Sequence, residues 1–142
     1  MKRGALLFVL ILGIVVLASC APKPEEVNAV VTEFWNQLKA NNPAGMVATM
    51  TAEVDCGMMS SKGIPALDLA EELANDMPID PNSTFSIITT NLYDCYAVVD
   101  GVIDPDPSTT DDEFTMTLHL RDTNDGWKIC LIMLHVSLFF PG

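Results

Sequence analysis

Residues 114–121 read FTMTLHLR, a stretch in which apolar and polar side chains alternate strictly. Successive side chains of a β-strand point to opposite faces, so this period of two predicts a strand with one buried and one polar face. From residue 84 onward the chain is also rich in β-branched and aromatic residues, which favour strands. The C-terminal part is therefore predicted to form a β-sheet.

Working outward from this stretch, turn residues divide the C-terminal part into about four antiparallel strands. The predicted strands are residues 84–91, 96–103, 114–121 and 127–139, with turns at 93–94 and 124–126 and an acidic loop at 104–112. The last strand is apolar on both of its expected faces, with Ile129, Leu131 and Met133 on one and Cys130, Ile132, Leu134 and Val136 on the other. We expect both faces to be covered, by helices on one side and by a curled sheet or a second subunit on the other.

The N-terminal half predicts helices. After Glu25 and Glu26, whose charges suit a helix N-terminus, apolar residues recur at the spacing of one helical face: Val27, Val30, Val31, Phe34 and Leu38. Asn41-Asn42-Pro43 ends this helix, a short helix is expected at 44–50, and residues 51–63 are expected to be irregular. A third helix is predicted from Ile64 to Met77, and Pro78 ends it.

Three local sequences carry a family resemblance: VVTEFWNQL at residues 30–38, DCYAVV at 94–99 and DGWKI at 125–129. With the order of helices followed by strands, the chain resembles the nuclear transport factor two-like superfamily, over most of residues 25–142. The resemblance implies an α+β cone in which a curved sheet wraps a long N-terminal helix. It looks most like the small lipoproteins of that superfamily whose domain has no assigned activity.

The N-terminus predicts a targeting segment. Lys2 and Arg3 precede an apolar run at residues 5–18, which is shorter than the roughly 20 residues that span a bilayer. Leu17-Ala18-Ser19-Cys20 then resembles the lipobox of prokaryotic lipoproteins. The resemblance implies a signal peptide at 1–19, fatty acylation of Cys20 and a tether at 20–24. The domain would then lie in the periplasm or outside the cell, anchored to the cell membrane or the outer membrane.

The charge and the cysteine content bear on nucleic-acid binding, disulfide formation and metal binding. The formal net charge is −12, with 7 Lys and Arg against 19 Asp and Glu, so a nucleic-acid partner is excluded. Besides Cys20 there are Cys56, Cys95 and Cys130, and the sequence does not select any disulfide among them. These cysteines, with His119 and His135, lack the spacings of a metal site, and no cofactor is predicted.

Some superfamily members are isomerases or polyketide cyclases, which use a carboxylate or histidine base in an apolar cone. The residues that fit such a role are Asp55, which follows the second helix, and His135, which is expected on the face of Trp127 and Met133. Tyr93 is a candidate donor. Asp94, Tyr96 and His119 belong to the same group, His119 being expected on the polar face of its strand, toward solvent or a subunit contact.

Three functions remain open at this point. The first is a non-catalytic, membrane-anchored domain that binds a small apolar ligand or a protein partner. It is suggested by methionines able to line an adaptable cavity, namely Met46, Met50, Met58, Met59, Met77, Met116 and Met133. The second is an isomerase or lyase acting through Asp55 or His135, and the third is a structural homodimer of the cell envelope.

Overall fold

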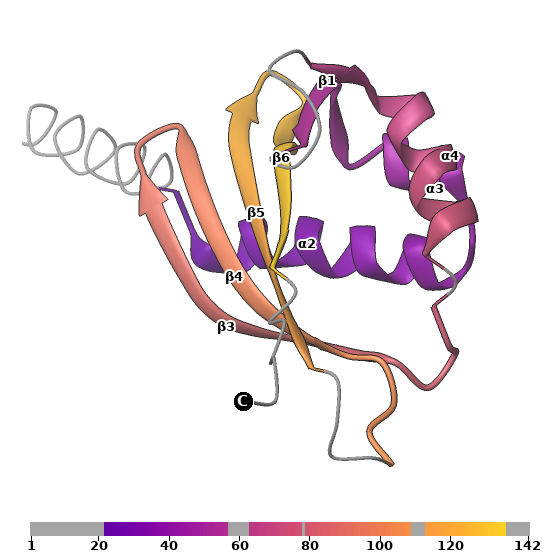
Figure 1. The fold of residues 1–142 in the computed structure, drawn as a ribbon. Coiled ribbons are helices and arrows are strands. Elements are labelled where there is room, and N and C mark those ends of the chain that lie inside the picture. The colour runs from indigo at the N-terminus through magenta and orange to yellow at the C-terminus, as the bar shows by residue number, and fades with distance from the viewer. Residues whose placement is uncertain (1–21, 57–62, 78, 109–112, 136–142) are drawn as a thin grey trace, which may run out of the picture.

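The computed structural model describes residues 22–56, 63–77, 79–108 and 113–135 (Figure 1). The predicted signal peptide, Cys20, Met58, Met59 and the predicted strand residues after 135 lie outside them. No helix within the described ranges has the length and apolar character needed to cross a membrane. The elements are, in chain order, α2 (Pro24–Lys39), α3 (Pro43–Val47), β1 (Met50–Cys56), β2 (Ile64–Pro65), α4 (Ala66–Asp76), β3 (Thr84–Tyr93), β4 (Tyr96–Asp104), β5 (Phe114–Thr123) and β6 (Gly126–His135).

Helix α2 confirms the N-terminal prediction. Pro24 stands in its first turn with two acidic residues, where a missing N–H costs nothing and negative charge meets the positive end of the helix dipole. One face is buried, by Val27, Val31, Phe34, Trp35 and Leu38. The helix ends before Asn41, whose φ of 52° is in the left-handed region. The side chain of Asn42 then caps α3 by accepting from the Gly45 amide at 3.3 Å.

The two later helices are shorter than predicted. Helix α3 ends at Val47 rather than at Met50, because Met50 already belongs to a strand. Helix α4 begins at Ala66 rather than at Ile64, because Ile64 and Pro65 form the short strand β2 that pairs with β1. In both places a sheet contact with a residue distant in the sequence replaces a helical turn.

The sheet has six strands rather than the predicted four, in the order β2-β1-β6-β5-β4-β3. The added strand β1 covers Met50–Cys56, most of which the sequence predicts to be irregular, and it runs parallel to β6. The sheet is therefore mixed rather than wholly antiparallel. Strands β3 to β6 confirm the predicted meander, and the β5–β6 hairpin turns at Asn124-Asp125 between the paired residues Thr123 and Gly126.

A bulge in β6 corrects the predicted faces of that strand. His119 pairs with Leu131 and Leu120 pairs with Ile129, so Cys130 is the extra residue of the bulge. The alternation shifts there by one residue. Ile129 and Ile132 consequently face the core together, opposite the buried Leu120 and Leu118.

The core lies between α2 and the inner face of the sheet. Figure 1 shows the sheet curving around α2, with α3 and α4 beside the C-terminal end of that helix. The inner side chains of β4 and β5 are almost fully buried, and these are Ala97, Val99, Ile103, Met116, Leu118 and Leu120. Thr90 at the sheet also donates a hydrogen bond of 2.7 Å to Asn28 of α2. This bond attaches the N-terminal half of α2 to β3.

Candidate ligand-binding groove

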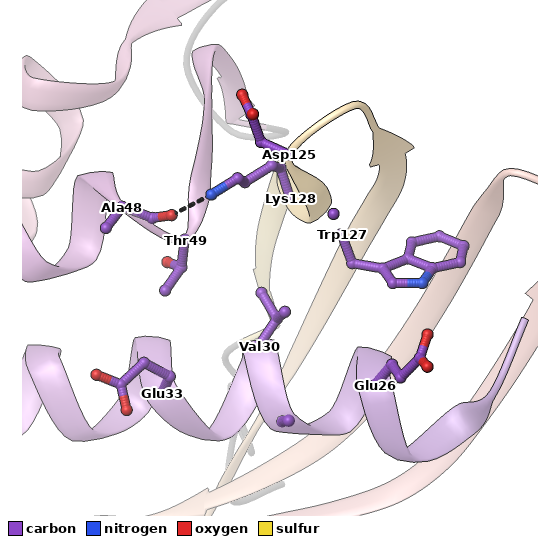
Figure 2. A pocket seen from close by; sticks show the side chains of 10 residues that line it. Glu26, Val30, Glu33, Ala48, Thr49, Asp125, Trp127 and Lys128 are labelled. Carbon is purple, nitrogen blue, oxygen red and sulfur yellow. Dashed lines mark hydrogen bonds between the residues drawn. The ribbon is translucent and has the colours of Figure 1, made fainter.

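A groove of about 450 Å³ lies at the edge of the core, between α2, the α3–β1 junction and the β5–β6 hairpin (Figure 2). Three separate segments line it: Glu26, Ala29, Val30 and Glu33 from α2, Ala48 and Thr49 from the junction, and Asp125, Gly126, Trp127 and Lys128 from the hairpin. This volume falls in the range of small-molecule sites.

Val30 and Trp127 are the two large apolar side chains that line the groove. Val30 is half-buried, and it lies on the side of α2 adjacent to the stripe that enters the core. Trp127 directly follows Gly126, whose φ of 93° lets the chain leave the turn and enter β6. Only 7% of Trp127 is exposed, and Figure 2 shows its indole on the side of the groove where Glu26 lies.

Hydrogen bonds attach the hairpin to the α3–β1 junction and so close one side of the groove. The Lys128 ammonium donates to the Ala48 carbonyl at 2.5 Å, the bond drawn as a dashed line in Figure 2. The Ile129 amide donates to the Thr49 carbonyl at 2.8 Å, and Thr49 Oγ1 donates to the Met46 carbonyl at 2.7 Å. All three acceptors are backbone carbonyls of residues 46–49. The bonds hold this wall in place without a ligand, so the wall is pre-formed.

The rim of the groove is acidic. Glu26 and Glu33 come from α2 and Asp125 from the hairpin, against the single cation Lys128. Glu33 accepts a hydrogen bond of 2.6 Å from the neutral amide of Gln37. Among the residues that line the groove, the rim carries three negative charges and one positive charge.

A second, smaller cleft of about 280 Å³ lies where the segment after α4 crosses the ends of β4 and β5. It is lined by Met77, Ile79, Asp80, Ser83, Ile103, Pro105 and Phe114. Ser83 is almost completely buried there and donates to the Pro105 carbonyl at 3.0 Å, while Lys39 donates to the Ser83 carbonyl at 3.0 Å. These bonds attach the segment after α4 to α2 and to the end of β4. We therefore interpret the cleft as a packing contact between elements of the fold.

The structure does not gather the predicted catalytic residues. Asp55 lies on β1 beside Leu131 of β6, not in the irregular segment expected, and its side chain is outside the described part. Tyr93 is 59% exposed at the end of β3. His135 is exposed at the end of β6, opposite Thr115, because the bulge at Cys130 moves it off the face of Trp127. Neither Tyr93 nor His135 reaches the interior of the cone.

Tyr96 and His119 do meet, on the outer face of the sheet. A hydrogen bond joins Tyr96 Oη to His119 Nδ1, and the two rings are in edge contact with centroids 5.5 Å apart. Burial lowers the pKa of His119 below its usual 6.5, although the Asp100 carboxylate opposes this shift. Burial also raises the pKa of Tyr96 above 10.0, aided by Cys130 and opposed by Arg121. The neutral form of His119 is thus favoured at neutral pH.

Asp94 and the described cysteines lie in a turn and on the sheet, away from the groove lining. Asp94 occupies the β3–β4 turn with a φ of 39°, a conformation that Asp tolerates better than most residues. Cys95, next to it, is exposed, and the Cys130 thiol donates to the His119 carbonyl at 3.4 Å. Cys95 and Cys130 do not form a disulfide with each other.

The predicted methionine-lined cavity is not formed by the described methionines. Met46, Met50 and Met116 are buried and fill the core. Met77 lines the second cleft, and Met133 pairs with Thr117 on the outer face of β6. Flexible thioethers here serve as packing material in different parts of the fold.

Sequence reasoning does not find the groove. It interprets the Asp125–Lys128 segment as a signature of the fold, and it assigns Val30 to the buried helical face. Val30 packs against the core as expected and also lines the groove, so its place on the apolar stripe does not reveal the groove.

No protein-family model matches the sequence, and no curated protein matches it either. Solved structures do match. An NTF2-like protein of unknown function from Shewanella baltica OS155 gives a TM-score of 0.63 at 16% identity, covering 78% of this chain and 90% of its own. A protein of unknown function with a cystatin-like fold from Nostoc punctiforme gives 0.60 at 13% identity, covering 82% and 92%. A Shewanella frigidimarina protein described as a "putative ketosteroid isomerase" gives 0.60 at 21% identity, covering 77% and 94%.

At these identities the likeness establishes the fold alone. The chain has the α+β NTF2-like cone fold, with helices packed on a curved sheet of six strands. This confirms the family resemblance as far as the fold of the domain is concerned.

Proposed function

We propose that this chain is a non-catalytic binding domain, held at a membrane outside the cytoplasm by a lipid on Cys20, which takes an apolar group into the groove beside α2. The groove carries this proposal. Its pre-formed volume of about 450 Å³ over Val30 and Trp127 has the size and the apolar character of a small-molecule site.

The composition of the described interior supports binding rather than catalysis. A general base of the isomerase type needs a titratable group inside the apolar cone. The buried polar residues among those described are Thr49, Ser83 and Thr117, and none of them titrates near neutral pH. The other buried side chains among those described are apolar.

The tether part of the proposal rests on the lipobox resemblance and on where the fold begins. Helix α2 starts at Pro24, four residues after Cys20, and every described helix and strand lies within 24–135. The mature chain from Cys20 onward therefore contains all the described packing. A soluble Cys20→Ser form of residues 20–142 consequently retains the complete described fold.

Detergent partitioning of the full-length chain tests the lipid tether. We expect the wild type to enter the detergent-rich phase of Triton X-114 and to show an N-terminal peptide that starts at a diacylglycerol-modified Cys20. The Cys20→Ser variant should keep its signal peptide and lack the diacylglycerol-modified N-terminal peptide. A wild-type chain without that modified peptide would remove the tether from the proposal.

Native mass spectrometry tests the binding function. The soluble mature form, purified from its own cells, is expected to carry a copurifying small molecule that Trp127→Ala and Val30→Ala remove. The matched control is Val102→Ala on the outer face of β4, which should keep the molecule. Retention of the molecule in both groove variants would place the site elsewhere.

An isomerase is the second candidate, and the description of the Shewanella frigidimarina protein favours it. Asp55 remains the candidate base, and its backbone lies on β1, the strand adjacent to β6. Proton exchange α to the carbonyl of a β,γ-unsaturated ketone measures this activity directly. The proposal expects no exchange above background, and Asp55→Ala should change nothing. Exchange that is lost in Asp55→Ala would establish the isomerase instead.

A structural homodimer is the third candidate. The outer face of the central strands carries apolar, half-buried side chains: Val98, Val102, Leu131 and Met133. Such a face is typical of an interface between subunits. Sedimentation equilibrium of the soluble mature form decides the question, since a dimer that Leu131→Lys dissociates would support it. A monomer at high concentration would exclude it.

A further inference from the structure

The geometry points to an organic cation as the occupant of the groove: a small ammonium compound with an apolar body, which Glu26, Glu33 and Asp125 select by charge. This inference deepens the proposed function and rests on its binding groove. It assigns a ligand class to a site that is otherwise defined by shape alone.

More negative than positive side chains line the groove. Glu26 and Glu33 are separated by two turns of α2, and Asp125 stands across the groove on the hairpin. No ion pair within the described ranges neutralises any of these three carboxylates. The one cation among the lining residues, Lys128, donates to the Ala48 carbonyl at 2.5 Å and keeps its positive charge. Three carboxylates against one ammonium leave the groove lining with a net negative charge.

Apolar side chains also line the groove. Val30 and Ala29 lie between the two glutamates of α2, and Trp127 faces them from the hairpin side. An inorganic cation would not use this surface, whereas an ammonium with an aromatic or aliphatic body buries it. Apolar surface and negative rim together fit an amphiphilic amine.

The size and overall charge exclude other ligand classes. A volume of about 450 Å³ accommodates a small molecule. Anionic ligands such as fatty acids or phosphates are repelled both by the rim and by a chain with formal net charge −12. A neutral apolar compound would fit the surface but gain nothing from the carboxylates.

The tether places this site near the proposed membrane. Four residues from Cys20 to Pro24 reach at most roughly 14 Å when fully extended. The groove residues of α2 follow within its first turns. The groove would therefore meet amines that have partitioned into the bilayer surface, at a higher local concentration than in solution.

Calorimetry with three probes of similar shape tests the inference. The probes are phenethylammonium, 2-phenylethanol and phenylacetate, added to the soluble mature form. We expect phenethylammonium to bind at least about tenfold more tightly than the alcohol, because it adds an attraction to the net negative charge of the groove lining. Phenylacetate should show no binding. The affinity for the cation should fall as salt is added.

Charge-matched variants separate a local site from the general field of an acidic protein. Glu26→Gln and Asp125→Asn should each weaken phenethylammonium binding about two- to fivefold, as expected for exposed ion pairs. Glu72→Gln, on the exposed face of α4 and away from the groove, makes the same charge change and should leave the affinity within error. Equal weakening by all three variants would overturn the inference.

The probes also separate this inference from the proposed function. If phenethylammonium and 2-phenylethanol bind equally and both disturb Trp127, the groove is a binding site and the charge selection is wrong. If phenylacetate binds best, the inference is likewise wrong. If no probe disturbs Trp127 up to its solubility limit, both the inference and the groove assignment fail.

Discussion

The two tryptophans of the chain have nearly equal exposure and different surroundings. Trp35 is 6% exposed, faces the sheet from α2 and packs on Phe85 with ring centroids 5.6 Å apart. Trp127 is 7% exposed and borders the open groove on another side of the same helix. Both side chains belong to the hydrophobic core, but among the two only Trp127 also lines the groove. The exposed fraction does not distinguish Trp35 from Trp127, whereas the open groove beside Trp127 does.

The largest expected effect comes from truncating the core side of α2. Phe34→Ala removes a fully buried ring and should lower the free energy of unfolding by about 3–5 kcal/mol. Val30→Ala, on the groove side of the same helix, should cost less than about 1 kcal/mol because Val30 is only half-buried. Urea titration followed by circular dichroism measures both. Similar losses would mean that the groove is part of the core.

Overpacking the core should cost somewhat less. A Cβ at Gly101 of β4 would overlap the ring of Phe85. That ring is held against Trp35, so it cannot move freely. Gly101→Ala should therefore destabilise by about 1–3 kcal/mol. Phe85→Leu in the Gly101→Ala background should recover part of the loss, and a larger loss in the double variant would contradict this explanation.

The wall of the groove is expected to respond more weakly. Lys128→Met removes the hydrogen bond to the Ala48 carbonyl and should cost less than about 1 kcal/mol, because the ammonium is near solvent. Amide exchange at Ile129, which donates to Thr49 O, should become faster. Lys128→Arg keeps a donor and should restore slow exchange. Unchanged exchange in Lys128→Met would show that the wall does not depend on this bond.

The smallest effect is the pH dependence that His119 contributes on the outer face. Its pKa is lowered in the folded state, so the unfolded chain binds its proton more tightly. The stabilisation is present above about pH 6.5 and is lost as the pH falls from there through the lower folded pKa. His119→Asn should flatten this part of the stability curve. Groove binding should not change over the same range in either form, and a parallel change would link the two regions.

Local patterns are sufficient for the elements whose partners are near in sequence. The apolar stripe of residues 27–38 determines α2, and the alternation at 114–121 determines β5, because each pattern lies within one element. The turn at Asn124-Asp125 is equally local. The buried face of α2 and the inner face of β5, which meet in the core, can therefore both be predicted from the sequence.

The elements that sequence reasoning does not find depend on distant contacts. In β1 only Met50 and Val54 have described, buried side chains, and the acidic Glu53 and Asp55 disfavour a strand. Its parallel pairing with β6 joins residues far apart in the chain, which no local period reveals. The bulge at Cys130 likewise reverses the face of every later residue in β6, including His135.

The groove could not be predicted for the same reason. Its three segments are residues 26–33, 48–49 and 125–128, and only the parallel β1–β6 pairing brings the last two together. Each segment by itself has an ordinary structural explanation. The candidate site is therefore a property of the tertiary fold, while the predicted catalytic residues are chosen for their chemistry alone.

The two tryptophans provide the most direct test of the central claim, which is that ligands enter the groove and not the cone interior. In a ¹⁵N-labelled soluble mature form, the indole N–H signals of Trp35 and Trp127 can be followed separately while phenethylammonium is added. We predict a saturable shift of the Trp127 signal with the Trp35 signal unchanged. A shift of Trp35 with Trp127 unchanged would contradict the account, because the ligand would then occupy the core.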